Sequence, residues 1–121
     1  MILVDTSIWI HHLRGGSDLL AKLLSAGRVL THPFVIGELA LGAMRQRETI
    51  LDALSNLPRA ELATDAEVLG FINGRALFER GIGYVDVHLL ASARLTAGAE
   101  LWTWDNHLRS VADELGLAMA S

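Results

Sequence analysis

Short, uninterrupted runs of apolar residues, separated by longer segments with helical signals, are the feature that most restricts how this chain can fold. The clearest runs cover residues 2–4, 29–31 and 101–103, and weaker ones cover 60–63 and 117–119. A run that stays apolar instead of alternating is typical of a strand buried on both faces, as strands are in parallel sheets. Strands that alternate with helices predict an α/β fold, a three-layer α/β/α sandwich around a central parallel sheet.

Capping and stop signals place helices between these runs. Ser17 can cap a helix that Gly27 closes, and Pro33 suits the first position of another helix. Thr64 and Glu67 form a capping-box pattern, which predicts a further helix start. After a short helix that begins at residue 6 or 7, the expected helices cover about 18–26, 33–44, 46–55, 65–80, 86–97 and 106–115.

Length and composition favour a single domain spanning residues 1–121, because a chain of 121 residues has no room for a second core. The hydrophobic fraction of 51% and the mean hydropathy of +0.35 are high for so small a domain, so we expect part of the apolar surface to meet another protein. There is no cysteine, no signal-peptide pattern and no apolar run of about 18 residues that could span a membrane. We therefore expect a cytoplasmic protein without disulfides or thiolate metal sites.

The formal net charge of −4 argues against a protein that binds nucleic acid through a large basic surface. Any contact with nucleic acid therefore has to be local. Of the ten basic residues only Lys22 is a lysine, and arginine can direct two donors onto one phosphate or carboxylate. This bias suits contacts with RNA or with an ion-paired partner protein, although codon usage in a GC-rich genome explains it equally well.

Three aspartates stand where the expected strands give way to helices. Asp5 follows the first apolar run directly, Asp105 lies just beyond the run at 101–103, and Asp86 stands at the start of a helix. In open parallel sheets, ligands bind at the carboxyl ends of the strands, so these positions predict a functional site. Aspartate is also a favoured helix N-cap, and each of the three can serve that structural purpose alone.

Glu38 is unusual because it is the one charged residue between Pro33 and Met44, in a helix that is otherwise apolar on all sides. Such a helix is typical of the protein interior, where a lone carboxylate is costly unless it is paired or binds a metal ion. We therefore expect Glu38 to be buried and to bind a metal ion. The alternative is an ion pair with Arg45 or Arg75.

We name Asp5, Glu38, Asp86 and Asp105 the acidic quartet. If the fold brings the four acids together, they need a cation, because each carboxylate raises the pKa of its neighbours. All-oxygen ligands, without cysteine or paired histidines, favour Mg²⁺ or Mn²⁺ over zinc and copper. One or two such ions can activate water, polarise a phosphate and stabilise the leaving oxygen. The quartet therefore predicts a metal-dependent hydrolase that cuts phosphodiester bonds.

Four short segments contain the acidic quartet: VDTSIW at 4–9, VIGEL at 35–39, YVDVHLLA at 84–91 and LWTWD at 101–105. They resemble the motifs of the PIN-domain family, and in particular those of the VapC toxins within it. The resemblance implies a parallel sheet, an acidic quartet that binds Mg²⁺ or Mn²⁺, and endonucleolytic cleavage of RNA by the toxin of a bacterial toxin–antitoxin pair. Asp5, Glu38 and Asp86 match the three core acids of the family, and Asp105 matches a more variable fourth.

The resemblance also assigns supporting residues and partners. Ser7 and Thr103 match hydroxyl positions that hold the first and fourth acids or a metal-bound water. Arg14 and the helices expected over 8–26 and 46–57 are implied to help form a groove for a VapB-like antitoxin. The C-terminal segment of such an antitoxin places a basic residue into the acidic site. A homodimer is implied as well.

Two further side chains are candidates for contact with substrate or antitoxin. His88 lies two residues beyond Asp86, although an ordinary helix histidine explains it better. Trp104, beside Asp105, can stack on a base. The other tryptophans, at 9 and 102, are expected to pack in the interior.

Two alternative functions use the same residues. The first is a nuclease or phosphatase that acts on DNA or on small phosphoesters. The second is a non-catalytic module whose acidic pocket only docks a basic peptide. Cleavage assays on RNA and DNA separate the nucleases, and metal titration separates an enzyme from a docking module.

Overall fold

The computed structural model describes residues 1–120, which form a three-stranded sheet and seven helices. No helix within these residues is both long enough and apolar enough to cross a membrane. The strands are β1 (Ile2–Val4), β2 (Val29–Leu30) and β3 (Glu100–Trp102). The helices are α1 (Thr6–Gly15), α2 (Asp18–Ser25), α3 (Pro33–Leu41), α4 (Arg47–Ser55), α5 (Asp65–Arg75), α6 (Tyr84–Leu95) and α7 (Asn106–Glu114).

The three strands run parallel in the order β2-β1-β3, so the first strand of the chain occupies the centre of the sheet. The register pairs Leu3 with Leu30 on one side and with Leu101 on the other. Every residue of β1 is buried, as expected for a strand covered on both faces. The predicted parallel sheet is therefore confirmed, and with it the α/β class.

The weak strand expected over 60–63 is wrong, and the one expected over 117–119 is confirmed only as a single bridge. Each is reduced to one bridge at an outer edge of the sheet, because the backbone pairs with the sheet around one residue only and then leaves it. After the first bridge, the amide of Glu61 donates to the hydroxyl of Thr96, which turns the chain away from the sheet. The bridges join Thr31 to Arg59 and Leu101 to Ala118.

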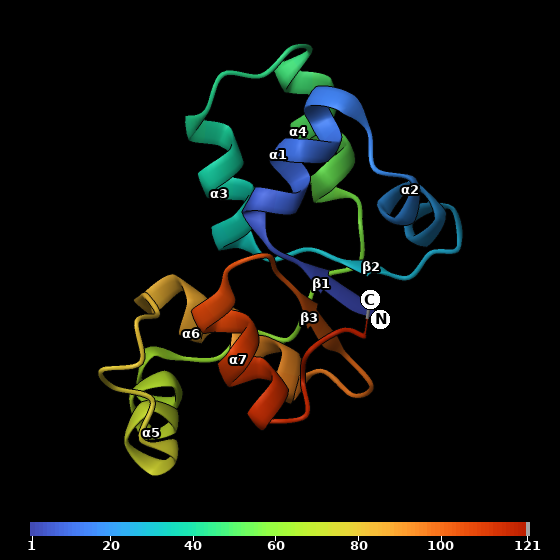
Figure 1. Cartoon of the computed structure of the whole chain (residues 1–121). Helices are drawn as coiled ribbons and strands as arrows, with labels where there is room; N and C mark the ends of the chain where they lie inside the picture. Colours follow the sequence, from blue (N-terminus) through green and yellow to red (C-terminus); the bar gives the residue numbers. More distant parts are fainter. Residues whose placement is uncertain (121) are drawn as a thin grey trace.

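The helices cover both faces of the sheet, which gives the three layers expected from the sequence (Figure 1). Helices α1, α3 and α4 lie on one side, and α6 and α7 lie on the other. Contacts between elements follow this arrangement, because α1 packs on α3, α3 packs on α4, and α6 packs on β3. Helix α5 lies at the periphery and packs on α6.

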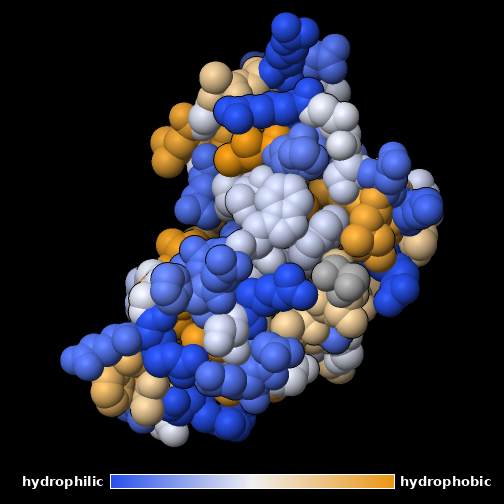
Figure 2. Space-filling view, in the orientation of Figure 1, coloured by the Kyte–Doolittle hydropathy of each residue, from blue (hydrophilic) through white to orange (hydrophobic). Residues whose placement is uncertain are grey.

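A core of buried apolar side chains joins the sheet to both helical layers. Helix α6 is buried from Val87 to Ala93, because it is enclosed between β3 and α5. Full burial of a leucine such as Leu3 or Leu89 stabilises the fold by about 1.5–3 kcal/mol relative to exposure. Apolar side chains also remain at the surface, where Figure 2 shows them as separate orange patches. Leu41, at the end of α3, is the extreme case and is 91% exposed.

Two helices end earlier than the sequence pattern predicts. Helix α3 stops at Leu41 instead of residue 44, because Gly42 adopts an extended conformation. Helix α5 stops at Arg75 instead of residue 80, because Ala76 takes the left-handed conformation with φ of 51°. The expected capping box of α5 is confirmed.

Candidate active site at the carboxyl edge of the sheet

The acidic quartet gathers at the edge where the strands end. The strand order reverses at β1, whose two neighbours are reached by separate crossovers, and ligands of open α/β sheets bind at such a point. Asp5 follows β1 directly. Its backbone amide donates to the Trp102 carbonyl oxygen at 3.0 Å. This bond extends the pairing of β1 with β3 and fixes the point from which the Asp5 side chain projects.

Thr103, buried just beyond β3, connects the first and fourth acids. Its hydroxyl donates to Oδ2 of Asp5 at 2.8 Å and accepts from the backbone amide of Asp105 at 3.1 Å. These contacts agree with the role that the sequence predicts for Thr103.

Asp5 and Asp105 both cap helices, so the structural role considered for them is present. Oδ1 of Asp5 accepts from the Thr6 amide at 2.8 Å, at the start of α1. Oδ1 of Asp105 accepts from the Leu108 amide at 2.9 Å, at the start of α7. Each cap uses one carboxylate oxygen, so capping does not prevent either side chain from binding a ligand as well.

Glu38 reaches the same edge from α3. Its Oε1 accepts from the hydroxyl of Thr6 on α1 at 2.7 Å, which ties the two helices together beside Asp5. The sequence prediction assigned the supporting hydroxyl of this segment to Ser7, whose side chain is exposed. The contact with an acid is made by Thr6 instead, and a role of Ser7 toward a metal-bound water stays a prediction.

The expectation of a buried Glu38 is wrong, because its side chain is exposed. Helix α3 buries only Val35 and Leu39, and its remaining sides are at least partly open to solvent. The apolar composition of α3 therefore did not predict burial of all its sides. The alternative of an ion pair with Arg45 or Arg75 is not observed among the described residues either.

Asp86 lies in the first turn of α6 and not at its cap, and its Oδ2 accepts from the Gly83 amide at 3.0 Å. Partial burial is the main cause that raises the pKa of Asp86 above its ordinary value, and the hydrogen bond from Gly83 opposes it. The negative charges of the other three acids raise this pKa further. All members of the quartet are therefore close enough to act on the proton of Asp86.

The four carboxylates are neighbours without being grouped as the ligands of one ion. Within residues 1–120, no three acidic or histidine side chains stand as close together as a metal ion requires. Each carboxylate accepts a hydrogen bond from the protein, and repulsion among four like charges opposes closer approach. The donor set fits a hard divalent cation, because it offers carboxylate and hydroxyl oxygens and the described residues include no cysteine.

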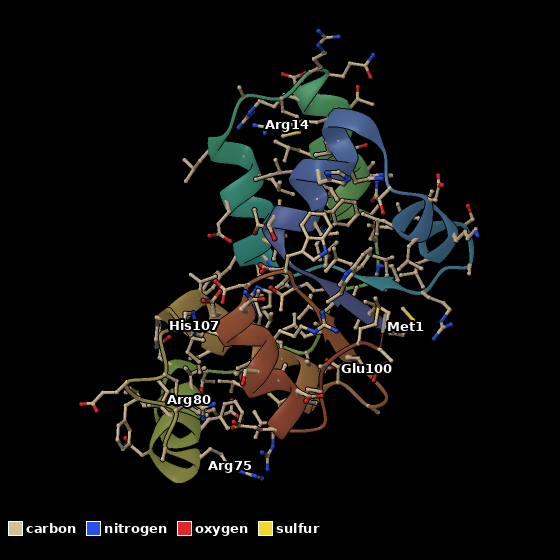
Figure 3. The ribbon with its side chains drawn as sticks, viewed as in Figure 1. Met1, Arg14, Arg75, Arg80, Glu100 and His107 are labelled. Atoms are coloured by element: carbon tan, nitrogen blue, oxygen red, sulfur yellow. The ribbon has the colours of Figure 1, made fainter. Side chains whose placement is uncertain are left out.

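A groove of about 770 Å³ opens beside Glu38, between α1, α3 and α4. Arg14 lines this groove about 12 Å further along α1 than Thr6, toward the outer end of the helix (Figure 3). The groove thus has a mixed lining, with the acid Glu38 and two cationic residues, Arg14 and Arg45, among apolar side chains. Its apolar lining includes Ile10, Leu13, Leu39, Met44 and Ile50.

The family of this chain follows from comparison with known proteins. The PIN domain family matches residues 2–114, which include all four acids. The chain belongs to the PIN-domain family. Two curated relatives, both named Ribonuclease VapC32, come from the Mycobacterium tuberculosis strains CDC 1551 / Oshkosh and ATCC 25618 / H37Rv. Each is 48% identical over 120 residues, which cover 99% of this chain and 97% of the relative. The predicted membership of the VapC branch of the PIN-domain family is confirmed.

His88 of this PIN domain cannot meet a substrate directly, because it is only 3% exposed. Two helical residues differ by about 200° in direction, so His88 faces away from Asp86. Its ring contacts Phe34 at 4.8 Å and Tyr84 at 4.7 Å, and its Nε2 lies 3.4 Å from Asp65 Oδ1. The predicted substrate contact at His88 is therefore wrong, and the ordinary helix histidine is the better description.

His32 is a structural residue of the PIN site that the sequence analysis overlooked. Its Nδ1 accepts from the Phe34 amide at 3.0 Å and so caps α3, the helix that bears Glu38. Burial lowers the pKa of His32 from 6.5 to about 4, with smaller contributions from the charges of His88 and Arg59. The imidazole therefore stays neutral and can accept the capping bond. The position directly before Pro33 was the available signal, because the residue before an N1 proline is the N-cap.

Proposed function

We propose that this chain is a Mg²⁺-dependent endoribonuclease, with Mn²⁺ able to substitute, and the toxin of a VapBC-like toxin–antitoxin module. The observation that carries the proposal is the acidic quartet at the end of the sheet, where burial and then the charges of the other three carboxylates raise the pKa of Asp86. Crowded like charges of this kind favour a bound divalent cation. The name of the relatives, Ribonuclease VapC32, supports RNA as the substrate.

The proposed ligands of the ion are Asp5, Glu38, Asp86 and Asp105. When bound, the ion activates water and polarises the scissile phosphate. Thr103 orients Asp5, and Thr6 orients Glu38, through the hydrogen bonds described above. Asp86 binds an ion only in its ionised form, and because its pKa is raised, binding weakens at a higher pH than it does for an ordinary aspartate as the pH falls.

Labelled RNA and DNA of the same sequence, incubated with Mg²⁺, with Mn²⁺ or with a chelator, test this function. We expect internal cleavage of RNA only when a divalent ion is present. Asp5→Asn should abolish both cleavage and the growth arrest that follows expression. Asp18→Asn, an acid at the start of α2 and outside the quartet, is the matched control and should change neither. Full toxicity of Asp5→Asn contradicts the proposal, and cleavage of DNA alone replaces it with the first alternative.

A non-catalytic docking module is the second candidate, and one observation favours it. The acids accept hydrogen bonds from the protein and are not grouped as ligands of an ion within residues 1–120. An ion at about 100 times its Kd stabilises a protein by about 2.7 kcal/mol, whereas a pure docking site gains almost nothing. Melting temperatures with and without Mn²⁺, for the wild type and Asp86→Asn, separate the two candidates.

The proposed occupant of the groove beside Glu38 is the C-terminal segment of a VapB-like antitoxin. The apolar lining suits a segment with apolar side chains, and Glu38 offers a partner for a basic residue at the sheet end. Leu13→Glu should weaken the complex with the antitoxin by at least about 10-fold, because it places a charge in the apolar lining. Leu69→Glu, on exposed α5, is the control, and an equal loss there argues against the groove.

We further propose that residues 1–121 act as one domain, as a homodimer, in the cytoplasm, where RNA and the antitoxin are present. Exposed apolar side chains outside the groove support an interface between copies, and they include Leu41, Leu62 and Leu95. Sedimentation of the isolated protein measures the mass in solution. A monomer at all concentrations tested contradicts the dimer.

A further inference from the structure

Trp104 differs from the other two tryptophans of the chain in its exposure. It is 49% exposed, whereas Trp9 and Trp102 are 3% and 7% exposed. It stands between Thr103 and Asp105, at the acidic edge of the sheet. Its backbone position is fixed, because the Thr103 hydroxyl bonds both to Asp5 and to the Asp105 amide. A large aromatic ring is thus presented to solvent from a rigid segment of the site.

The orientation of the Trp104 ring is set by a second element. The imidazole of His11, on α1, lies 5.1 Å from the indole with an angle of 72° between the ring planes. In this edge-to-face arrangement, the histidine restrains the indole from one direction without enclosing it. His11 is therefore a positioning residue for Trp104, and a face of the indole stays available to a planar partner.

The charge of the site explains what such a ring contributes. RNA-binding proteins usually gain most of their affinity from contacts between basic residues and phosphates, but this chain has a net charge of −4 and four acids at its site. A base has no net charge, and its stacking on an aromatic ring is not opposed by carboxylates. Stacking therefore offers binding energy that phosphate contacts alone do not supply here.

We infer that Trp104 stacks on an unpaired base of the RNA next to the phosphate held at the acidic quartet, with its ring oriented by His11. The inference rests on the proposed ribonuclease function. Single-stranded RNA presents unstacked bases that proteins bind through aromatic faces. The contact selects unpaired RNA over duplex and positions the strand before cleavage.

Tryptophan fluorescence tests the inference without any need for activity, because the other two tryptophans are buried. The protein used is Asp5→Asn, which leaves the RNA uncut, and the probes are eight-nucleotide oligoadenylate and the same oligomer with all bases removed. We expect saturable quenching by the complete oligomer and none by the abasic one. In the double variant Asp5→Asn/Trp104→Leu the quenching is lost, and the Kd measured by fluorescence anisotropy of a labelled oligomer rises by roughly 5- to 150-fold.

Three further variants test whether the aromatic face of residue 104 is what binds the RNA. Trp104→Phe retains an aromatic face and should recover most of the affinity, and His11→Ala should weaken binding less than Trp104→Leu does. Phe78→Leu removes an aromatic ring of similar exposure outside the site and should leave the Kd unchanged. Quenching that survives Trp104→Leu overturns the inference. So does an unchanged Kd for RNA combined with weaker binding of the antitoxin, since Trp104 then serves the partner protein.

Steady-state kinetics of RNA cleavage separate a loss of base stacking from a loss of the ribonuclease function. A wild-type protein that cuts RNA with Mg²⁺, and a Trp104→Leu variant with the same KM and kcat, leave the ribonuclease in place and remove the stacking. A wild-type protein that cuts no RNA removes the proposed function itself. If both the ribonuclease function and the stacking are correct, Trp104→Leu raises KM more than it lowers kcat, because the substitution acts on binding of the RNA strand.

Discussion

The acidic quartet is held in different ways on its two sides. On one side, which we name the sheet corner, Asp5 and Asp105 follow strand ends and are joined through buried Thr103. On the other side, the helix corner, exposed Glu38 is held by the hydroxyl of Thr6. Thr103 anchors the sheet corner in the packed centre of the fold, although Asp105 itself is exposed like Glu38, whereas the helix corner borders an open groove.

This difference indicates that the two corners contribute differently to the proposed ion site, one as a rigid part and the other as an adjustable part. Packing around strand ends allows little movement, so in the proposed metal site the sheet corner is the part that determines where the ion is held. Helix α3 buries only Val35 and Leu39 and depends on its His32 cap, so the helix corner can adjust when a ligand enters the groove. Variants at each corner test whether the two corners differ in this way.

The largest effect is expected from a pair of substitutions that neutralise one acid at each corner. Asp5→Asn should lower kcat/KM for RNA by at least about 10³-fold, because the ion loses a fixed ligand and several kcal/mol of charge stabilisation. Glu38→Gln should be about 10-fold less damaging, because its carboxylate lies on the adjustable side. Cleavage rates at fixed Mg²⁺ measure both. Equal losses show that the corners are not distinct.

The second effect concerns stability at acid pH and acts on the helix corner. Unfolded His32 gains its proton near pH 6.5 but folded His32 only near pH 4, so its contribution is complete above 6.5 and is lost as the pH falls toward 4. The loss amounts to about 3 kcal/mol of unfolding free energy. Denaturant unfolding at pH 7 and pH 4 measures it. The control His32→Asn, which keeps a capping side chain without titrating, should lose correspondingly less.

An intermediate effect is expected from Thr103→Val, which removes the hydroxyl of the sheet corner while keeping the side chain's shape. Without the Thr103 bond, the Asp5 carboxylate keeps only its bond from the Thr6 amide, and partners of metal ligands typically contribute 10- to 100-fold to affinity or activity. We expect a loss of about 10- to 100-fold in Mn²⁺ affinity by calorimetry. Thr103→Ser should restore the affinity, and a Thr103→Val protein with normal affinity refutes the role of the hydroxyl.

The smallest effect is expected from Thr6→Val at the helix corner. The bond to Glu38 is exposed to solvent and contributes on the order of 1 kcal/mol, so Mn²⁺ affinity should fall by about 5-fold. The same calorimetric titration measures it, with Ser7→Ala as the neighbouring control. A larger loss from Ser7→Ala than from Thr6→Val assigns the supporting hydroxyl to Ser7 after all.

The placement of the acids could be predicted because it depends on local sequence and a topological rule. Asp5 follows a buried apolar run, Asp105 lies just beyond another such run, and strands of a parallel sheet end at one edge. The three layers followed from the alternation of strands and helices. The family prediction, based on four motifs in order, is confirmed by the match of the PIN domain family to residues 2–114.

Other features of the site depend on facts that sequence patterns do not contain. Exposure of Glu38 depends on which neighbours cover α3, and its composition gives no information about them. The hydroxyl facing Glu38 depends on the residue at which α1 begins, because a shift of one residue turns a side chain by about 100°. For His88, closeness to Asp86 in sequence concealed that the two residues lie on different sides of α6.

The central position of β1 determines when during synthesis the protein becomes able to cut RNA. Strand β1 emerges from the ribosome first, but its neighbour β3 begins at Glu100, and the bond from Thr103 to Asp5 joins residues 98 positions apart. Contacts this distant in the chain form only after most of the polypeptide has been made. A nascent or prematurely ended chain that lacks Asp105 carries an incomplete set of acids. If all four acids are required, as proposed, the nascent chain cannot cut RNA until Asp105 has been made, when translation is almost complete.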